Sequence, residues 1–226
     1  MPSLIVSLGN SVVYSGSVMV PCLSVYVGYE KKFICILDFW STGRDVMQKR
    51  VLLLTGNPGV GKTTVLLKAV NALKEKGFCV GGMVSREARE NGVRVGFEIL
   101  DLNSGRSGWL AHVNQKTGPH VGKYRVNLED LDFIGAEAIE VAVEKCAVIA
   151  IDEVGPMELF SERFKEATRK ALESSKPVVA VVHWKAHDKL ISEAKNRQDS
   201  ETFTVTQENR NKLPEIITQK TLQALK

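Results

Sequence analysis

The residues best suited to chemistry stand in the stretch VLLLTGNPGVGKTT, Val51 to Thr64. Gly56, four residues, and then Gly61, Lys62 and Thr63 match the pattern G-x-x-x-x-G-K-[ST]. Glycines let backbone N–H groups turn toward phosphate oxygens, and a helix that opens here adds its positive end. The pattern therefore predicts a loop that holds the phosphates of a nucleotide.

Two residues after the glycines supply the chemistry of this loop. Lys62 brings a positive charge to the outer phosphates. The Thr63 hydroxyl is placed to bind Mg²⁺, and Thr64 follows as the first ordinary residue of the helix. A glycine-rich turn that carries a lysine by chance is the alternative, but it would not have the apolar strand and the amphipathic run that flank this loop.

A second group of candidates stands in AVIAIDEVGPMEL, Ala147 to Leu159. The apolar run is typical of a central strand covered on both faces, and it ends on Asp152 at the edge of the sheet where ligands bind. Asp152 is therefore a candidate Mg²⁺ ligand. Glu153 beside it is a candidate catalytic base that orients or deprotonates a water molecule. A helix cap or a loop salt bridge is the alternative role for Glu153.

Later segments add candidates with two open roles each. Glu158 follows a Gly-Pro turn, where it either caps the helix that begins near Ser161 or faces the outermost phosphate, and we expect the cap. His183 ends the apolar run KPVVAVVHW, where it either senses that phosphate or forms a hydrogen bond at the strand end. Asn209 and Arg210 follow the last predicted strand, Thr202 to Thr206. They either contact the nucleobase or stand in the first turn of a helix that Thr206 caps.

The elements that must position these residues alternate along the chain. From Val51 onward, strand-like and helix-like segments follow one another, which predicts an α/β P-loop fold with a mostly parallel sheet covered by helices on both faces. The first helix is predicted from Gly61 to about Lys76, with Gly77 as its stop. The next strand is predicted from Phe78 to Ser85.

The alternation breaks in the stretch NGVRVGFEILDLNSGRSGWLAHV. Apolar residues recur at every second position from Val93 to Ile99 and again from Trp109 to Val113, which predicts a small inserted β-hairpin. Asn127 then caps a predicted helix. Four arginines of the hairpin region are candidates to bring a positive charge to the outermost phosphate: Arg86, Arg89, Arg94 and Arg106.

The composition suits one α/β domain with a sizeable core, because 44% of the 226 residues are hydrophobic. The net charge is +4 and no long basic run occurs, so a nucleic-acid partner is unsupported, although not excluded. Four separated cysteines form no C-x-x-C pair, which favours a reduced, cytoplasmic protein over a disulfide framework or a zinc site. We expect two of them, Cys79 and Cys146, to be small core residues.

The first 46 residues differ from the rest. No side chain from Met1 to Tyr29 is charged, but Ser, Gly, Asn and Pro interrupt the apolar residues throughout. The stretch is a poor membrane span and lacks the basic start of a secretory signal. Met47 stands four residues before the first strand. We therefore expect residues 1–46 to be a poorly ordered, spurious extension without a function, and residues 47–226 to form the domain.

Six segments carry a resemblance to a known family. They are VLLLTGNPGVGKTT, GGMVSREARENGVRVGFEILDL, GKYRV, IAIDEVGPMELFS, VVHWKAH and FTVTQENRNKLPE, in this order. Between Arg50 and about Leu225 they resemble the THEP1-type nucleoside-triphosphatases, a group with archaeal and thermophilic-bacterial members and a vertebrate cancer-related nucleoside-triphosphatase. The P-M-E after Asp152 and the T-x-E-N-R-like tail are more specific than the phosphate-binding loop.

The resemblance implies a Mg²⁺-dependent enzyme that hydrolyses ATP, GTP and other nucleoside triphosphates to the diphosphate and phosphate, with broad base tolerance. The residues themselves make Lys62 and Glu153 the candidate catalytic residues and Thr63 and Asp152 the candidate magnesium ligands. Two nucleotide-binding segments follow from the resemblance. The first comprises Gly56, Asn57, Pro58, Gly59, Val60, Gly61, Lys62, Thr63 and Thr64, and the second Val148, Ile149, Ala150, Ile151, Asp152, Glu153, Val154 and Gly155.

Physical arguments also favour hydrolysis. A phosphotransferase excludes water, usually under an arginine-bearing lid, and no arginine-rich lid follows the late strands. A GTPase switch would carry an N-K-x-D base reader, and this string does not occur. A small-molecule or polynucleotide kinase is the alternative, and a nucleotide-sensing binding module comes third. We expect no membrane partner and no obligatory protein partner.

Overall fold

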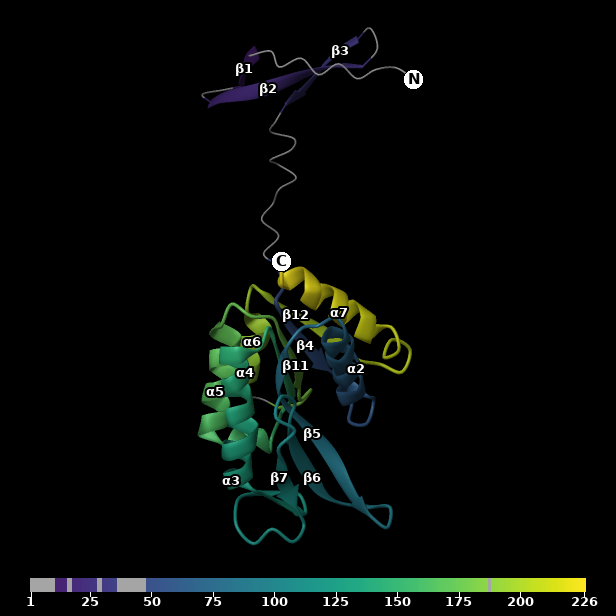
Figure 1. Ribbon diagram of the computed structural model, residues 1–226, viewed down its shortest axis with the longest axis vertical. Coiled ribbons are helices and arrows are strands. Elements are labelled where there is room, and N and C mark those ends of the chain that lie inside the picture. The colour runs from purple at the N-terminus through teal and green to yellow at the C-terminus, as the bar shows by residue number, and fades with distance from the viewer. Residues whose placement is uncertain (1–10, 16–17, 28–29, 36–47, 187) are drawn as a thin grey trace. The chain divides into compact units, whose positions relative to one another are not determined.

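A computed structural model describes residues 11–15, 18–27, 30–35, 48–186 and 188–226 (Figure 1). The chain divides into two units, Met1–Met47 and Gln48–Lys226. In the first unit, β1 (Ser11–Ser15), β2 (Val18–Val27) and β3 (Glu30–Cys35) form an antiparallel sheet in the order β1-β2-β3. The other residues of the predicted extension lie outside the described residues. No helix among the described residues is long and apolar enough to cross a membrane.

One nine-stranded sheet forms the centre of the second unit, in the order β12-β4-β11-β10-β5-β6-β7-β9-β8. The strands from β12 to β5 pair in parallel, and those from β5 to β8 pair in antiparallel fashion. The predicted α/β fold with mostly parallel central strands is confirmed. The bounds are β4 (Val51–Thr55), β5 (Val80–Glu90), β6 (Val93–Asp101), β7 (Ser107–His112), β8 (His120–Val121), β9 (Tyr124–Val126), β10 (Val148–Val154), β11 (Val178–Val182) and β12 (Ser200–Thr204).

Helices cover both faces of the parallel part, as predicted. Figure 1 shows α2 and α7 on one face and α4, α5 and α6 on the other. The helical elements are α2 (Lys62–Glu75), α3 (Leu128–Asp130), the π-helix η1 (Leu131–Ala136), α4 (Glu137–Lys145), the 3₁₀-helix η2 (Glu158–Phe160), α5 (Glu162–Glu173), α6 (Lys189–Asn196) and α7 (Leu213–Ala224).

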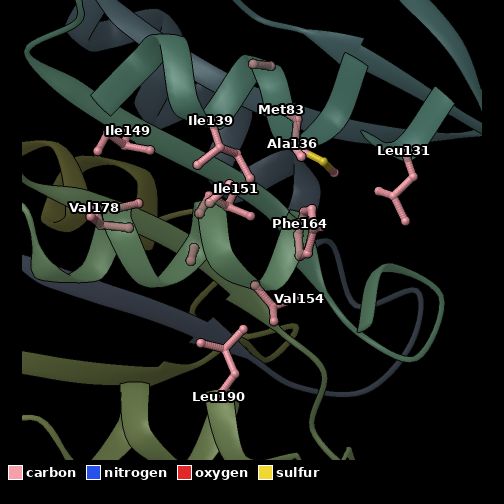
Figure 2. Packing of buried hydrophobic residues seen from close by; sticks show 14 of the residues in the cluster. Met83, Leu131, Ala136, Ile139, Ile149, Ile151, Val154, Phe164, Val178 and Leu190 are labelled. Atoms are coloured by element: carbon pink, nitrogen blue, oxygen red, sulfur yellow. The ribbon is translucent and has the colours of Figure 1, made fainter. Parts of the chain in front are cut away.

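Two hydrophobic clusters explain why the central strands are apolar at every position. Leu52 and Leu54 of β4 pack in the cluster that contains the buried face of α2, whereas Leu53 belongs to the cluster beneath α4 and α5. Successive side chains of a strand point to opposite faces, so a strand covered on both faces cannot alternate with polar residues. Figure 2 shows the second cluster, in which Ile151 of β10 and Phe164 of α5 take part.

The first helix has the ends that its sequence predicts. Gly61 precedes α2 with φ 107°, in the left-handed region that favours glycine. At the other end, Gly77 N donates to Lys74 O at 2.9 Å and Phe78 N to Leu73 O at 3.1 Å. These two bonds satisfy carbonyls of the last turn. The helix therefore starts where the phosphate-binding loop ends.

The antiparallel part is larger than the small hairpin that the sequence predicts. β5 does not end near Ser85 but continues to Glu90, and it pairs with β6 across a turn at Asn91 and Gly92. Both turn residues have positive φ, as a two-residue hairpin requires. The residues from Arg86 to Glu90 are polar except for Ala88, so they lack the apolar pattern that predicts a strand. Backbone pairing does not depend on apolar side chains.

Two predicted helix starts and the predicted burial of two cysteines can be compared with the structure. Asn127 caps its helix as predicted, since its Oδ1 accepts a hydrogen bond from Asp130 N at 3.3 Å. The last helix begins at Leu213 and not near Thr206. Cys146 is buried, but Cys79 is exposed, because β5 begins one residue after it. Both thiols are free.

Candidate active site

The phosphate-binding loop connects β4 to α2, and its backbone depends on glycine. A Cβ on Gly56, whose φ is 144°, would lie 2.6 Å from Val205 O. Any other residue would therefore push the loop away from the segment after β12. Asn57, Pro58 and Gly59 are exposed, so this part of the loop is open to a ligand.

Lys62 lies inside the loop. Its side chain is largely buried, and its Nζ donates to Gly56 O at 3.2 Å and to Asn57 O at 3.3 Å. The carbonyls of the loop thus fix the ammonium group at its centre. This is the position in which the lysine of such a loop serves outer phosphates as a point charge.

Asp152 is the strongest candidate for a metal ligand. Val148 and Ala150 face the α2 side of the sheet, and Asp152 continues their alternation. Its carboxylate is fully buried, and neither oxygen has a hydrogen-bond partner within the described residues. Burial raises the pKa of Asp152 to about 7, while the Thr63 hydroxyl and the Lys62 charge oppose this rise.

These features fit a magnesium ion. A buried carboxylate without a donor needs a cation or a proton, and hydroxyl and carboxylate oxygens are ligands that Mg²⁺ prefers. The Thr63 hydroxyl and the Asp152 carboxylate are the groups that would hold it. No group of three or more metal-binding side chains occurs among the described residues.

Glu153 lies beside this pair because β10 is irregular. Four residues of β10, from Ile151 to Val154, stand opposite three of β11, from Ala180 to Val182, and such a bulge changes the direction of a side chain. Burial raises the pKa of Glu153, whereas the charges of Lys62 and His183 lower it. The structure therefore brings Glu153, Lys62 and His183 within electrostatic range of one another.

The apolar residues of the second predicted nucleotide-binding segment, Val148 to Gly155, are buried in the sheet. Val148, Ile149, Ala150 and Ile151 are fully buried in the sheet, and Val154 is nearly so. They carry the acidic pair to the edge of the sheet and do not reach an open surface. Of this segment, Asp152 and Glu153 present their side chains to the site.

His183 has the strand-end role, which is one of the two that the sequence left open. Its backbone N donates to Val154 O at 3.1 Å, and its Nδ1 accepts a bond from Lys185 N at 3.3 Å. These contacts hold the strand end. The same imidazole lies close enough to Glu153 to affect its pKa.

Two cavities adjoin the phosphate-binding loop. The larger, about 590 Å³, lies between residues 55–60 of the loop, Trp184, Lys195 and residues 204–207. The smaller, about 150 Å³, lies between Gly61, Thr64, Val65, Lys68, Arg210 and Asn211. The loop is therefore accessible from two sides.

Two polar residues between β12 and α7, Asn209 and Arg210, have different roles. Asn209 is structural, because its Oδ1 accepts from Thr206 N and its Nδ2 donates to Thr204 O, each at 2.8 Å. Arg210 packs against the phosphate-binding loop, since a Cβ on Gly61 would lie 3.7 Å from its Cδ. Its exposed guanidinium reaches Val60 O at 3.5 Å. Arg210, and not Asn209, is thus available to a ligand.

Three of the four hairpin arginines have other partners. Arg89 and Arg94 both pair with Glu87, at 2.8 and 2.7 Å, and Arg106 pairs with Glu137 at 2.9 Å. Arg86 has no ion pair among the described residues and stands two residues beyond Val84, which is the register partner of Asp152. Arg86 is therefore the hairpin arginine nearest the acidic pair in the register of the sheet.

Glu158 does not have the predicted capping role. Ser161 caps α5, because its Oγ accepts a bond from Phe164 N at 2.9 Å. The Glu158 carboxylate instead turns inward and accepts a bond from Gly155 N at 3.1 Å. Burial, together with the charges of Glu153 and Asp152, raises its pKa to about 8.

The stability of the ligand-free protein is expected to depend on pH through Glu158. Its pKa is about 8 in the fold and near its ordinary value when unfolded, so the folded state binds more protons between these values. The free energy of unfolding should therefore fall as pH rises from about 5 to about 8. Urea unfolding across this range tests the slope. Glu158→Gln, which cannot ionise, should make it shallower, and the slope that remains comes from Asp152 and Glu153, whose pKa values are also raised. Equal slopes for the two proteins would contradict this assignment.

Comparisons with known proteins show the family of the chain. The family model described as NTPase matches residues 51–218. A relative named nucleoside-triphosphatase THEP1, from Thermofilum pendens, is 47% identical over 169 residues, which cover 74% of this chain and 93% of that protein.

Two solved structures share the fold. The crystal structure of THEP1 from Aquifex aeolicus has a TM-score of 0.65 and 28% identity, and the match covers 74% of this chain and 96% of that one. The solution structure of a human cancer-related nucleoside triphosphatase has a TM-score of 0.64 and 37% identity, with 75% and 96% covered. The predicted resemblance is confirmed: the chain belongs to the NTPase family, together with the THEP1 nucleoside-triphosphatases.

Proposed function

We propose that this chain hydrolyses nucleoside 5′-triphosphates such as ATP and GTP to the diphosphate and phosphate, with Mg²⁺ as cofactor. The observation that carries the proposal is the Asp152 carboxylate, which is buried and has no hydrogen-bond partner within the described residues, with Glu153 beside it and Lys62 within electrostatic range. The names of the relatives support the same activity. A nucleotide held in the loop would have its outermost phosphate between the lysine and the two acids.

Magnesium dependence follows from the ligand set. Thr63 and Asp152 would hold the ion, which when bound neutralises charge on the outer phosphate oxygens. Lys62 adds a second positive charge and keeps its position through the loop carbonyls. Removal of divalent ions with a chelator should therefore stop phosphate release, and added Mg²⁺ should restore it.

Glu153 is the proposed general base. Its carboxylate accepts a proton from water as the water oxygen forms a bond to the outermost phosphorus. The bond from this phosphorus to the bridging oxygen breaks, and its electron pair stays with the diphosphate. Lys62 stabilises the charge that develops on the leaving oxygen. His183, which lowers the pKa of Glu153, favours the ionised form that this role requires.

Hydrolysis has better support than phosphoryl transfer to an acceptor. A kinase closes a positively charged lid over both substrates. Here Arg89 and Arg94 pair with Glu87 of β5, and Arg106 pairs with Glu137 of α4. Water also reaches the exposed residues Asn57 to Gly59. The proposal is tested by phosphate release from Mg²⁺–ATP without any acceptor.

Broad base tolerance is proposed to rest on Arg210. A guanidinium plane stacks on any nucleobase, because every base has a π face, and this contact reads no donor or acceptor pattern. We expect Arg210→Ala to raise KM by roughly tenfold for ATP, GTP, CTP and UTP alike. Inorganic tripolyphosphate, which has no base, should bind to the variant as it does to the parental protein.

The control for this prediction is Lys212→Ala, which removes another exposed cation from the same segment. It should leave all four KM values unchanged. A change in KM for one base only, or an equal loss of tripolyphosphate affinity, would contradict stacking by Arg210.

A further inference from the structure

Glu158 is a buried acid that the proposed chemistry does not use. Its side chain is 5% exposed and belongs to η2, the short 3₁₀-helix that follows the Gly155-Pro156 turn. A buried carboxyl group is costly unless it forms hydrogen bonds, and a role as the cap of α5 is already filled by Ser161. The placement of Glu158 therefore needs another explanation.

The hydrogen bond of Glu158 holds the backbone just after the candidate base. Its Oε2 accepts from Gly155 N at 3.1 Å. β10 ends at Val154, so Gly155 is the first residue that the sheet no longer fixes. At Gly155, two residues after Glu153, the chain leaves the sheet. The hydrogen bond from Gly155 N to Glu158 fixes the backbone there in place of the hydrogen bonds between strands.

The carboxyl groups of the two glutamates also lie close to the same point beside Gly155. A Cβ built on Gly155 would lie 3.2 Å from Glu153 Oε1 and 3.2 Å from Glu158 Oε2. Gly155 thus leaves just enough room for both carboxyl groups. Glu153 is packed against the turn that Glu158 holds, so a movement of this turn would move the Glu153 carboxylate.

We propose that Glu158 is a positioning residue, which fixes Glu153 in its catalytic position by accepting the hydrogen bond from Gly155 N. The proposal rests on the proposed hydrolysis and adds a residue to it that does not touch the nucleotide. What Glu158 must supply is an acceptor oxygen in a fixed place. A negative charge is not needed for this task, and burial of the side chain favours the neutral form.

If Glu158 must supply an acceptor oxygen but no charge, two substitutions should have different effects on kcat. Glu158→Gln keeps an oxygen that can accept from Gly155 N in a side chain of equal size. Glu158→Leu fills similar space but has no acceptor. We expect kcat of the glutamine variant to stay within about threefold of the parental value, and kcat of the leucine variant to fall about tenfold or more. KM for Mg²⁺–ATP should change less than twofold in both.

A second background tests whether the effect acts through Glu153. In a protein that already carries Glu153→Gln, Glu158→Leu should have little further effect on kcat, because the positioned base is absent. If the leucine variant does not fold, Gly155→Ala gives the same information. Its Cβ would displace both carboxyl groups and should lower kcat while KM stays the same.

The experiment measures steady-state phosphate release by the full chain for all these variants, with thermal unfolding as the check of folding. Rescue by glutamine but not by leucine, together with the non-additive double variant, is the expected result. Parental kcat in the leucine variant, equal losses in the leucine and glutamine variants, or additive losses in the double variant would overturn the proposal. A parental chain that releases no phosphate would instead overturn the proposed function, and this inference with it.

Discussion

Replacing Lys62 with alanine is expected to lower the turnover of Mg²⁺–ATP by roughly 100- to 1,000-fold, the effect of removing one strong donor to a developing charge. The affinity for nucleotide should also fall, because Lys62 is a largely buried cation among the loop residues that hold phosphates. Alanine also removes the two bonds from Nζ to the carbonyls of Gly56 and Asn57. Phosphate release and equilibrium binding of ATP measure the two effects separately.

The matched control is Lys189→Ala on α6, where the lysine side chain is 86% exposed and forms a loose ion pair with Glu193. It removes the same charge from the surface, and it should leave turnover unchanged. Hydrolysis at the parental rate by Lys62→Ala would mean that phosphate release takes place outside the loop from Gly56 to Thr63.

Replacing Glu153 with glutamine is expected to lower kcat by about 100-fold or more while nucleotide binding is retained, since a general base contributes to the chemical step only. Glutamine fits the same space beside the β10 bulge but accepts no proton at neutral pH. It also removes one carboxylate that raises the pKa of Asp152, so Mg²⁺ binding should not weaken greatly. Single-turnover phosphate release, measured with enzyme in excess, isolates the chemical step.

Glu193→Gln on α6 is the control for Glu153, because it makes the same chemical change at an exposed site. A parental rate in Glu153→Gln would remove Glu153 from the chemistry. A loss of ATP binding equal to the loss of turnover would instead assign Glu153 to ligand binding.

The parts of the site that are local in sequence were predictable. The positions of Gly56 and Gly61 fix a backbone that few other residues adopt, and the apolar run before Asp152 places this residue at an edge of the sheet. Both signals depend on a few consecutive residues. The strand-loop-helix context and the acidic pair could therefore be predicted without knowledge of the rest of the fold.

The antiparallel part is longer than the predicted hairpin, because apolar periodicity does not reveal the pairing of β5 with β6. Arg86 to Glu90 is polar, and it pairs with β6 only because the turn brings the two segments together. The Asn91-Gly92 dipeptide was the available signal, since this pair favours a two-residue hairpin. This dipeptide indicates a hairpin between β5 and β6, in addition to the one between β6 and β7.

The role of Glu158 could not be predicted because it depends on burial and on a contact that no pattern specifies. From the sequence, an acid before Ser161 suggests a helix cap. In the fold, the Ser161 hydroxyl takes this role and the Glu158 carboxyl turns toward Gly155. The role of Arg210 has the same origin, because its contact with Gly61 joins segments about 150 residues apart.

The central claim is that the loop and the acidic pair hydrolyse nucleoside triphosphates without an acceptor. Phosphate release by the full chain from ATP, GTP, CTP and UTP with Mg²⁺ tests it most directly, with Lys62→Ala and a chelator as controls. We predict many turnovers on all four nucleotides and their loss in both controls. Tight binding of ATP without phosphate release, or phosphate release only after nucleosides, nucleotides or RNA ends are added as acceptors, would contradict the claim and favour a kinase.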